Sequence, residues 1–245
     1  MIHLKDKVII VTGGNGLLGS KLLHAIKEWG GIPINADLVL KPMDFETHVC
    51  DIADMESVEK MAVSVLAKHG RIDGFVNNAY PRTTDWGNKW EDISVDSWRA
   101  NVDMHLNGYF ITSKVILEIM KRQKFGSFVN MASIYGMVGP HFEVYDQTSM
   151  TMPAAYSAIK GGIINLTRYL ASYFGPHQIR INAVSPGGIY DFQSPQFVDN
   201  YERIVPLKRM GKAEEIPYSV CFLLSDAASY ITGQNIVVDG GWTAI

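Results

Sequence analysis

The chain has 245 residues, of which 47% are hydrophobic and 19% are charged, and its formal net charge is −3. This is the composition of a globular protein with a sizeable core, and the length suits one large α/β domain. The slight negative charge argues against nucleic acid or an anionic membrane as a partner, and no apolar run reaches the roughly 20 residues that span a bilayer. Since no signal-peptide pattern or histidine spacing for a metal is present, we expect a cytoplasmic, metal-free protein with Cys50 and Cys221 reduced.

Short apolar segments alternate with longer helical patterns along the whole chain. Their continuous apolar character is typical of strands buried on both faces of a parallel sheet. The alternation predicts right-handed βαβ units, and therefore one α/β domain over residues 1–245: a doubly wound, Rossmann-type parallel sheet with helices on both faces. The expected strands are Val8–Val11, Ile32–Ala36, Gly74–Asn77, Ser127–Met131, Arg180–Val184 and Asn235–Val238, and the expected helices are Leu18–Trp29, Met55–His69, Ser97–Arg122, Ala155–Phe174 and Ala213–Leu224.

A glycine-rich turn, Thr12–Gly19, follows the first expected strand and leads into the first helix. Ligands of doubly wound sheets bind beyond the carboxyl ends of the strands, which is where this turn lies. Glycines let a backbone approach a ligand closely, and a helix N-terminus offers free N–H groups to a pyrophosphate. The spacing is G-x-x-G-x-x-G, so a tight turn without a ligand is the alternative, but the position favours a dinucleotide.

Asp37 follows the second expected strand. A carboxylate at this point can accept hydrogen bonds from the adenosine ribose hydroxyls, and it would repel the 2′-phosphate of NADP. Its neighbours Ala36 and Leu38 carry no positive charge. These residues favour NAD as the cofactor, with a turn or helix-cap aspartate as the alternative.

Tyr156 and Lys160 are four residues apart in an expected helix, so they share one face. A lysine ammonium beside a phenol stabilises the phenolate and lowers a pKa that is about 10 when unperturbed. That shift suits Tyr156 to proton transfer near neutral pH. Ser133 follows the strand expected at Ser127–Met131, where its hydroxyl could polarise a substrate oxygen. A surface Tyr–Lys pair and a turn serine are the alternatives.

Taken together, these motifs resemble the short-chain dehydrogenase/reductase family, in its compact single-domain branch. The resemblance covers nearly the whole chain. It implies that Tyr156 is the general acid/base, that Lys160 holds the nicotinamide ribose and tunes Tyr156, and that Ser133 binds the reacting oxygen. The segments that carry it are Thr12–Gly19, Asp51-Ile52, Asn77-Asn78-Ala79, Asn130–Ser133, Tyr156–Lys160, Asn182–Gly187 and Asp239-Gly240-Gly241.

The resemblance also implies a cofactor site and an oligomer. The C-terminal segment Tyr230–Gly241 resembles the family's last strand, which usually joins a homotetramer interface, so we expect a homotetramer or a homodimer. The residues expected to bind NAD are Gly13, Asn15, Gly16, Leu17, Leu18, Asp37, Asp51, Ile52, Asn78, Ala79, Tyr156, Lys160, Pro186, Gly187 and Ile189.

Four positions depart from the family pattern. Leu17 stands where the compact branch usually has its second glycine, Tyr80 replaces the last glycine of N-N-A-G, and Asp191 stands where relatives often have threonine. His105 occupies the position of a helix asparagine that holds a proton-relay water in many relatives. An imidazole can itself carry protons, so His105 is a candidate catalytic residue; a packed helix histidine is the alternative.

Two expected substrate loops, at about 134–155 and 188–210, mix aromatic with polar side chains. Such a lining suits a hydroxylated, sugar-like molecule better than an apolar one. We expect substrate contacts from His141, Tyr145 and Gln193, although solvated loop residues are the alternative for each. The first loop and the ending Gly240-Gly241-Trp242 resemble a subgroup assigned to bacterial flagellin modification and nonulosonic-acid sugar supply.

The sequence therefore predicts an NAD(H)-dependent oxidoreductase that interconverts a secondary alcohol and a ketone. The expected substrate is a small molecule: a sugar, a sugar phosphate or a nucleotide-linked sugar. A 3-ketoacyl-carrier-protein reductase is the enzymatic alternative, against which Asp37 argues because that activity normally prefers NADPH. A catalytically silent NAD-binding regulator or partner subunit is the other alternative, which His105 favours and the presence of Ser133, Tyr156 and Lys160 opposes.

Overall fold

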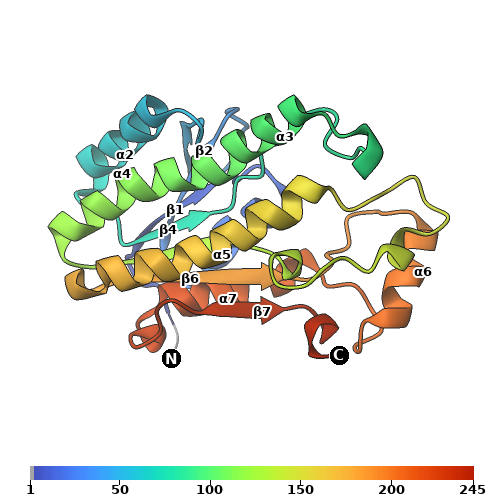
Figure 1. Ribbon diagram of the computed structural model, residues 1–245. Coiled ribbons are helices and arrows are strands. Elements are labelled where there is room, and N and C mark those ends of the chain that lie inside the picture. Colours follow the sequence, from blue (N-terminus) through green and yellow to red (C-terminus); the bar gives the residue numbers. More distant parts are fainter. Residues whose placement is uncertain (1–2) are drawn as a thin grey trace.

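A seven-stranded, fully parallel sheet forms the centre of the computed structural model, which describes residues 3–245 (Figure 1). The strand order is β3-β2-β1-β4-β5-β6-β7, so the order reverses between β1 and β4. That reversal opens a crevice at the carboxyl ends of the strands. The strands are β1 (Val8–Thr12), β2 (Ile32–Asp37), β3 (Glu46–Val49), β4 (Gly74–Asn77), β5 (Gly126–Met131), β6 (Ile179–Pro186) and β7 (Asn235–Val238).

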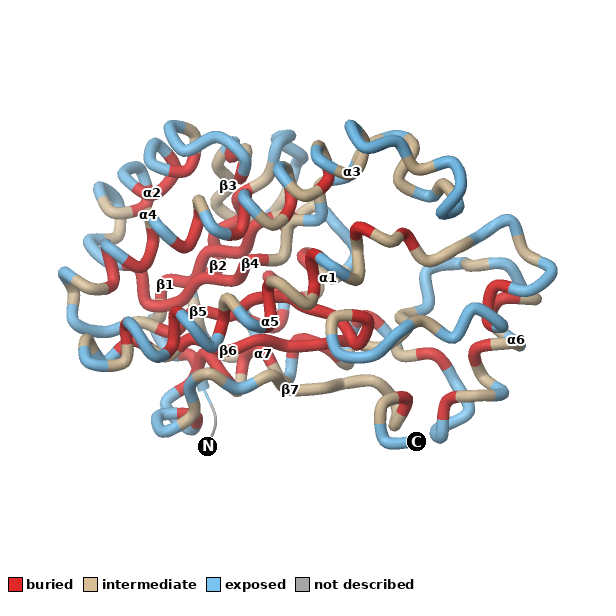
Figure 2. Tube along the Cα trace, viewed as in Figure 1, coloured by how far each residue is buried: buried red, intermediate tan, exposed pale blue. Residues whose placement is uncertain are grey.

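Helices cover both faces of the sheet. Successive side chains of β1 enter opposite cores: Val8 and Ile10 pack with α2, α4 and α5, whereas Ile9 and Val11 pack with α1 and α7. The central strands β1, β4, β5 and β6 are consequently buried along almost their whole length, whereas the edge strands β3 and β7 are only partly buried and the outer faces of the helices are exposed (Figure 2). The helices are α1 (Leu17–Glu28), α2 (Met55–His69), α3 (Val95–Asn101), α4 (Gly108–Gln123), α5 (Ala154–Phe174), α6 (Pro195–Ile204) and α7 (Pro217–Leu224).

The predicted fold class is confirmed, with three differences in its elements. The strand β3 was missed because it is a short edge strand with no fully buried residue. The helix expected at Ser97–Arg122 is divided, because a π-helical segment, Val102–Asn107, separates α3 from α4. The second substrate segment contains α6, which Ser194 caps by accepting a hydrogen bond from the backbone N–H of Phe197.

The strands β4, β6 and β7 point toward the side of the molecule where α6 and the loop before α3 lie (Figure 1). The expected substrate loops therefore surround the carboxyl ends of the strands. Cys50 and Cys221 are both free and buried. Within residues 3–245, no helix is both long and apolar enough to cross a membrane.

Candidate active site

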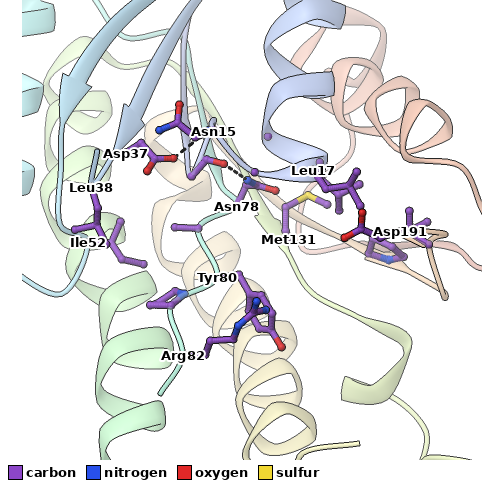
Figure 3. Close-up of a pocket in the computed structure, with 18 of the residues that line it drawn as sticks. Asn15, Leu17, Asp37, Leu38, Ile52, Asn78, Tyr80, Arg82, Met131 and Asp191 are labelled. Atoms are coloured by element: carbon purple, nitrogen blue, oxygen red, sulfur yellow. Dashed lines mark hydrogen bonds between the residues drawn. The ribbon is translucent and has the colours of Figure 1, made fainter. Parts of the chain in front are cut away.

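A cleft of about 860 Å³ opens at the carboxyl ends of the strands (Figure 3). It runs from Asp37 and Leu38 at the end of β2 to Tyr156 on α5. Every residue that the sequence predicted to bind NAD lines it. These residues are Gly13, Asn15, Gly16, Leu17, Leu18, Asp37, Asp51, Ile52, Asn78, Ala79, Tyr156, Lys160, Pro186, Gly187 and Ile189.

The glycine turn is held close to the loop after β4. Gly13 has a φ of +66°, and a Cβ at this position would lie 2.8 Å from the Cα of Ala79, so a larger residue has no room. The Asn78 side chain donates hydrogen bonds to the carbonyl oxygens of Thr12 (2.9 Å) and Gly13 (3.2 Å). Helix α1 starts directly after Gly16 without a side-chain cap, which leaves first-turn N–H groups available to an anion such as a pyrophosphate.

Asp37 lies at the opposite end of the cleft from Tyr156. Its Oδ2 accepts a hydrogen bond from the backbone N–H of Asn15 (3.0 Å), which ties the end of β2 to the glycine turn (Figure 3). Its Oδ1 lies 3.5 Å from the backbone nitrogen of Val39, leaving lone pairs for the hydroxyls of a ribose. Lys41, which sequence reasoning did not identify, also lines this end.

Lys160 is buried among the groups expected to carry the chemistry. Its ammonium donates a hydrogen bond to the carbonyl oxygen of Met131 (2.7 Å) and lies 5.5 Å from the ring centre of Tyr156. The side chain is only 4% exposed, and this burial lowers the pKa of Lys160 to about 7. The protonation state of Lys160 is therefore sensitive to any charge placed in the cleft.

Tyr156 and Ser133 meet beside Lys160. Burial raises the pKa of Tyr156, and a hydrogen bond with the Ser133 side chain acts in the opposite direction. We expected a lowered pKa from the nearby ammonium alone; in this chain desolvation outweighs the polar neighbours. Ser133 is buried, and its hydroxyl oxygen also accepts the backbone N–H of Tyr135 (3.2 Å).

His105 is fully buried within the π-helical segment Val102–Asn107. Its Nε2 lies 3.4 Å from the Lys160 ammonium, while its Nδ1 has no partner among the described residues. Burial, followed by the charge of Lys160, holds the pKa of His105 well below its usual range, so the ring is neutral. If Nε2 accepts from Lys160, then Nδ1 carries the proton and is a buried donor without an acceptor.

An aromatic wall stands opposite Tyr156, and sequence reasoning did not identify it as part of the site. Tyr80 packs edge-on against Tyr156 with ring centres 5.6 Å apart, and Trp86 does the same at 6.1 Å. The indole Nε1 of Trp86 donates to the Tyr80 hydroxyl (2.7 Å). The unusual tyrosine after N-N-A was the only sequence signal of this wall.

Of the three residues expected to contact the substrate, the structure places one in the cleft and two outside its lining. Gln193 lines the cleft together with Asp191, and its amide donates to the carbonyl oxygen of Ile189 (2.9 Å). His141 and Tyr145 are not among the lining residues: His141 packs against Trp242, and Tyr145 is buried against Phe197. His141 and Tyr145 are thus held by aromatic packing with Trp242 and with Phe197 of α6, away from the cleft lining.

Tyr201 on α6 links this helix to the cofactor side of the cleft. Its hydroxyl accepts the backbone N–H of Gly188 (2.7 Å), and its ring stacks on Trp242 at 4.6 Å. A side chain at Gly188 would collide with the Tyr201 ring, because a Cβ would lie 2.6 Å from it. The Gly187-Gly188 segment and α6 are thus packed as one unit.

Several known proteins are similar to this chain along most of its length. A family model described as Enoyl-(Acyl carrier protein) reductase matches residues 35–243. The post-translational flagellin modification protein A of Campylobacter coli is 35% identical over 98% of this chain and 99% of its own length. A 2,5-dichloro-2,5-cyclohexadiene-1,4-diol dehydrogenase of Sphingobium indicum is 32% identical over 100% of both chains.

A solved structure is equally similar. The short chain dehydrogenase of Leptospira borgpetersenii, determined with bound NAD+, is 32% identical and has a TM-score of 0.90, with 98% of this chain and 94% of that one covered. The resemblance identified from the motifs is therefore confirmed: this chain belongs to the short-chain dehydrogenase/reductase family.

Proposed function

We propose that this protein is an NAD(H)-dependent oxidoreductase that interconverts a secondary alcohol and a ketone, with Tyr156 as its proton-transfer residue. One observation carries the proposal: Tyr156, Ser133 and Lys160 converge at one end of a cleft whose other end presents the Asp37 carboxylate. The NAD+ bound to the Leptospira relative supports the same cofactor class. Asp37 favours NAD over NADP because its charge opposes a 2′-phosphate.

The residues of the cleft fit a dinucleotide. The glycine turn and the start of α1 would hold the pyrophosphate, Asp37 the adenosine ribose, and Lys160 the nicotinamide ribose. The nicotinamide, when bound, supplies or accepts the hydride.

The chain's own residues bind the substrate oxygen and transfer a proton to it or from it. The Tyr156 hydroxyl donates its proton to that oxygen during reduction and takes it back during oxidation. Ser133 donates a hydrogen bond to the same oxygen, and the Lys160 ammonium stabilises the phenolate left on Tyr156. The Nε2 of His105 lies beside the Lys160 ammonium; if it accepts a hydrogen bond from that ammonium, the buried Nδ1–H would be left to donate to a relay water.

We also propose a hydroxylated substrate: a sugar, a sugar phosphate or a nucleotide-linked sugar. Asp191 and Gln193 supply hydrogen-bonding groups to the cleft, and Tyr80 supplies an aromatic face. The Sphingobium relative is named for a cyclic diol, which is also a hydroxylated ring.

A 3-ketoacyl-carrier-protein reductase is the second candidate, because the matching family model is described by an acyl-carrier-protein substrate. The NADPH preference usual for that activity conflicts with Asp37. A catalytically silent NAD-binding regulator is the third candidate, and the imidazole at position 105 favours it.

The association state belongs to the proposal as well. Large apolar side chains are exposed on α4 and α5, among them Phe110, Tyr169 and Tyr173. We propose that the protein is a homotetramer or a homodimer. Light scattering measures the molar mass of the purified protein in solution, and a monomer at micromolar concentration would contradict this proposal. A cytoplasmic location remains a prediction.

A spectrophotometric screen tests the proposed activity. NADH and NADPH oxidation, and NAD+ reduction, are followed with sugar phosphates, nucleotide sugars, polyols and acyl thioesters, using Tyr156→Phe as the matched control. We expect turnover of a hydroxylated compound with NAD(H) that the variant abolishes. Turnover of acyl thioesters with NADPH would favour the second candidate, and NADH binding without turnover across the panel would favour the third.

A further inference from the structure

The loop after β4 places a cation on the aromatic wall of the cleft. Arg82 lines the cleft, with its guanidinium carbon 5.1 Å from the ring centre of Tyr80 (Figure 3). Tyr80 in turn packs against Tyr156, so one aromatic ring separates Arg82 from the expected reaction centre. A guanidinium held beside an aromatic ring still has N–H groups left to bind a ligand, because it carries five N–H donors.

Arg82 has no carboxylate partner within residues 3–245, whereas other arginines of the chain, such as Arg71 and Arg209, form ion pairs. The other cations of the described cleft lining are differently placed. Lys160 is buried with its ammonium bonded to Met131, and Lys41 lies on the segment that follows Asp37, at the adenosine end. Near Tyr156, the exposed positive charge available to a ligand is therefore that of Arg82.

The backbone that carries Arg82 is anchored to α3. The backbone N–H of Thr83 donates to Oδ1 of Asn101 (3.0 Å), and Nδ2 of Asn101 donates to the Thr83 hydroxyl (2.8 Å). Asn101 itself is only 2% exposed. These bonds hold the backbone next to Arg82, and its guanidinium lies over the Tyr80 ring, so part of the entropic cost of ordering the arginine is met before a ligand binds.

We propose that Arg82 binds an oxyanion of the substrate, either a phosphate ester or a carboxylate, and so selects hydroxylated substrates that carry a negative charge. The inference rests on the proposed function, because it assigns the Tyr156 end of the cleft to the substrate. The planar guanidinium matches either oxyanion through two parallel N–H···O bonds. Asp191 and Gln193 would be left to the uncharged hydroxyls of the same molecule.

The test compares charged and neutral ligands of otherwise similar structure on the NADH-loaded protein. Glucose 6-phosphate is paired with glucose, and gluconate with sorbitol, and affinities are measured by calorimetry. We expect one anionic member to bind at least tenfold more tightly than its neutral partner, and Arg82→Gln to remove that advantage. An advantage of glucose 6-phosphate over glucose would identify the bound group as a phosphate ester, and an advantage of gluconate over sorbitol would identify it as a carboxylate.

Two further variants sharpen the result. Arg99→Gln removes one exposed positive charge from α3, outside the cleft lining, and should leave the advantage unchanged. Arg82→Lys keeps the charge but loses the forked geometry, so we expect a partial loss.

Equal affinity within both pairs, or an advantage that survives Arg82→Gln, would overturn the proposal, as would the absence of saturable binding by either anion. A loss of NADH affinity in Arg82→Gln would instead assign the residue to the cofactor and overturn it as well. Failure of the proposed function has a separate signature: the wild type does not bind NADH, or Tyr156→Phe remains active.

Discussion

Two groups of polar side chains, all buried except the partly buried Tyr156, lie next to each other at the carboxyl ends of β4 and β5. They differ in how many of their polar atoms have a hydrogen-bond partner. In the asparagine cluster (Asn77, Thr112, Asn130 and Thr167), Asn77 donates to Asn130 (3.0 Å), Asn130 donates to Thr167 (2.9 Å), and the Thr112 hydroxyl donates to Asn77 (2.8 Å).

In the tyrosine–lysine cluster (His105, Ser133, Tyr156 and Lys160), the Nδ1 of His105 has no partner within residues 3–245, and burial lowers the pKa of the Lys160 ammonium. Burial of a polar group without compensation costs free energy. The asparagine cluster avoids that cost and connects strands to helices, whereas the tyrosine–lysine cluster bears it at the end of the cleft. This contrast supports our proposal that the tyrosine–lysine cluster is the functional one.

Removal of the phenolic hydroxyl should have the largest effect. We expect Tyr156→Phe to lower kcat by about 10²–10⁴-fold, the usual contribution of a positioned proton donor, while the NADH affinity stays within a few-fold. Steady-state kinetics and NADH fluorescence titration measure the two quantities. Retention of most activity would show that the proton comes from another group.

A substitution in the asparagine cluster should lower the stability of the fold instead of the activity. Asn130→Ala removes the nearer acceptor of the Asn77 amide (3.0 Å) and leaves it only the longer contact with the Tyr109 carbonyl oxygen (3.4 Å). We therefore expect the free energy of unfolding to fall by about 1–3 kcal/mol, with activity per folded molecule little changed. Urea denaturation provides the measurement, and Asn107→Ala, at an exposed position, is the matched control that should change it by less than about 0.5 kcal/mol. Unchanged stability with lost activity would reverse our assignment of the two clusters.

Asp37→Ala should change cofactor choice at the far end of the cleft. We expect NAD to bind about tenfold more weakly, since hydrogen bonds to a charged group are lost, and the preference over NADP to narrow. Asp37→Asn keeps an oxygen that can accept the backbone N–H of Asn15 but removes the negative charge. A change of cofactor preference in this variant therefore reports the loss of repulsion of the 2′-phosphate, and not a loss of the hydrogen bond to the glycine turn. An unchanged NAD/NADP preference in both variants would show that Asp37 is not the selector.

NADH binding should depend on pH through Lys160. Its pKa is about 7 in the chain alone, and the negative charge of NADH raises it, so binding takes up a proton above pH 7. The dissociation constant should therefore increase as the pH rises from 7 to 9, by at most about tenfold per unit. Lys160→Met should bind more weakly but show a flat profile in the same titration; a sloping profile in this variant would implicate a different group.

His105→Asn should have the smallest effect. An amide restores the group that many relatives carry at this position, so we expect most activity to remain. His105→Leu, which removes both nitrogens at similar volume, should lose far more. An inactive but folded His105→Asn variant, with folding checked by circular dichroism, would show that the imidazole itself is required.

The sequence predicted which residues line the cleft around the glycine turn, for a physical reason. Thr12–Gly19, Asp37 and Ser133 each lie at the carboxyl end of a different strand, and a parallel sheet brings these ends to one edge. The Tyr156–Lys160 pair shares a helix face wherever that helix lies. Local pattern and strand order were enough to place these groups.

The substrate half could not be predicted in this way. The wall of Tyr80, Arg82 and Trp86 depends on how one loop packs against α3 and α5, which no periodicity encodes. His141 was expected in the cleft but packs on Trp242, from the far end of the chain. Contacts between irregular segments distant in sequence decide these positions.

The π-helical segment Val102–Asn107 has a consequence for how the substrate end could be altered. Deletion of one residue there would restore a continuous α-helix and rotate α3 by about 100° relative to α4. Asn101 would then swing away from Thr83, and Arg82 would leave the aromatic wall with it. The length of the π-helical segment thus determines the orientation of the loop that carries Arg82. A one-residue length change in this segment could alter the substrate charge preference as readily as a substitution of Arg82.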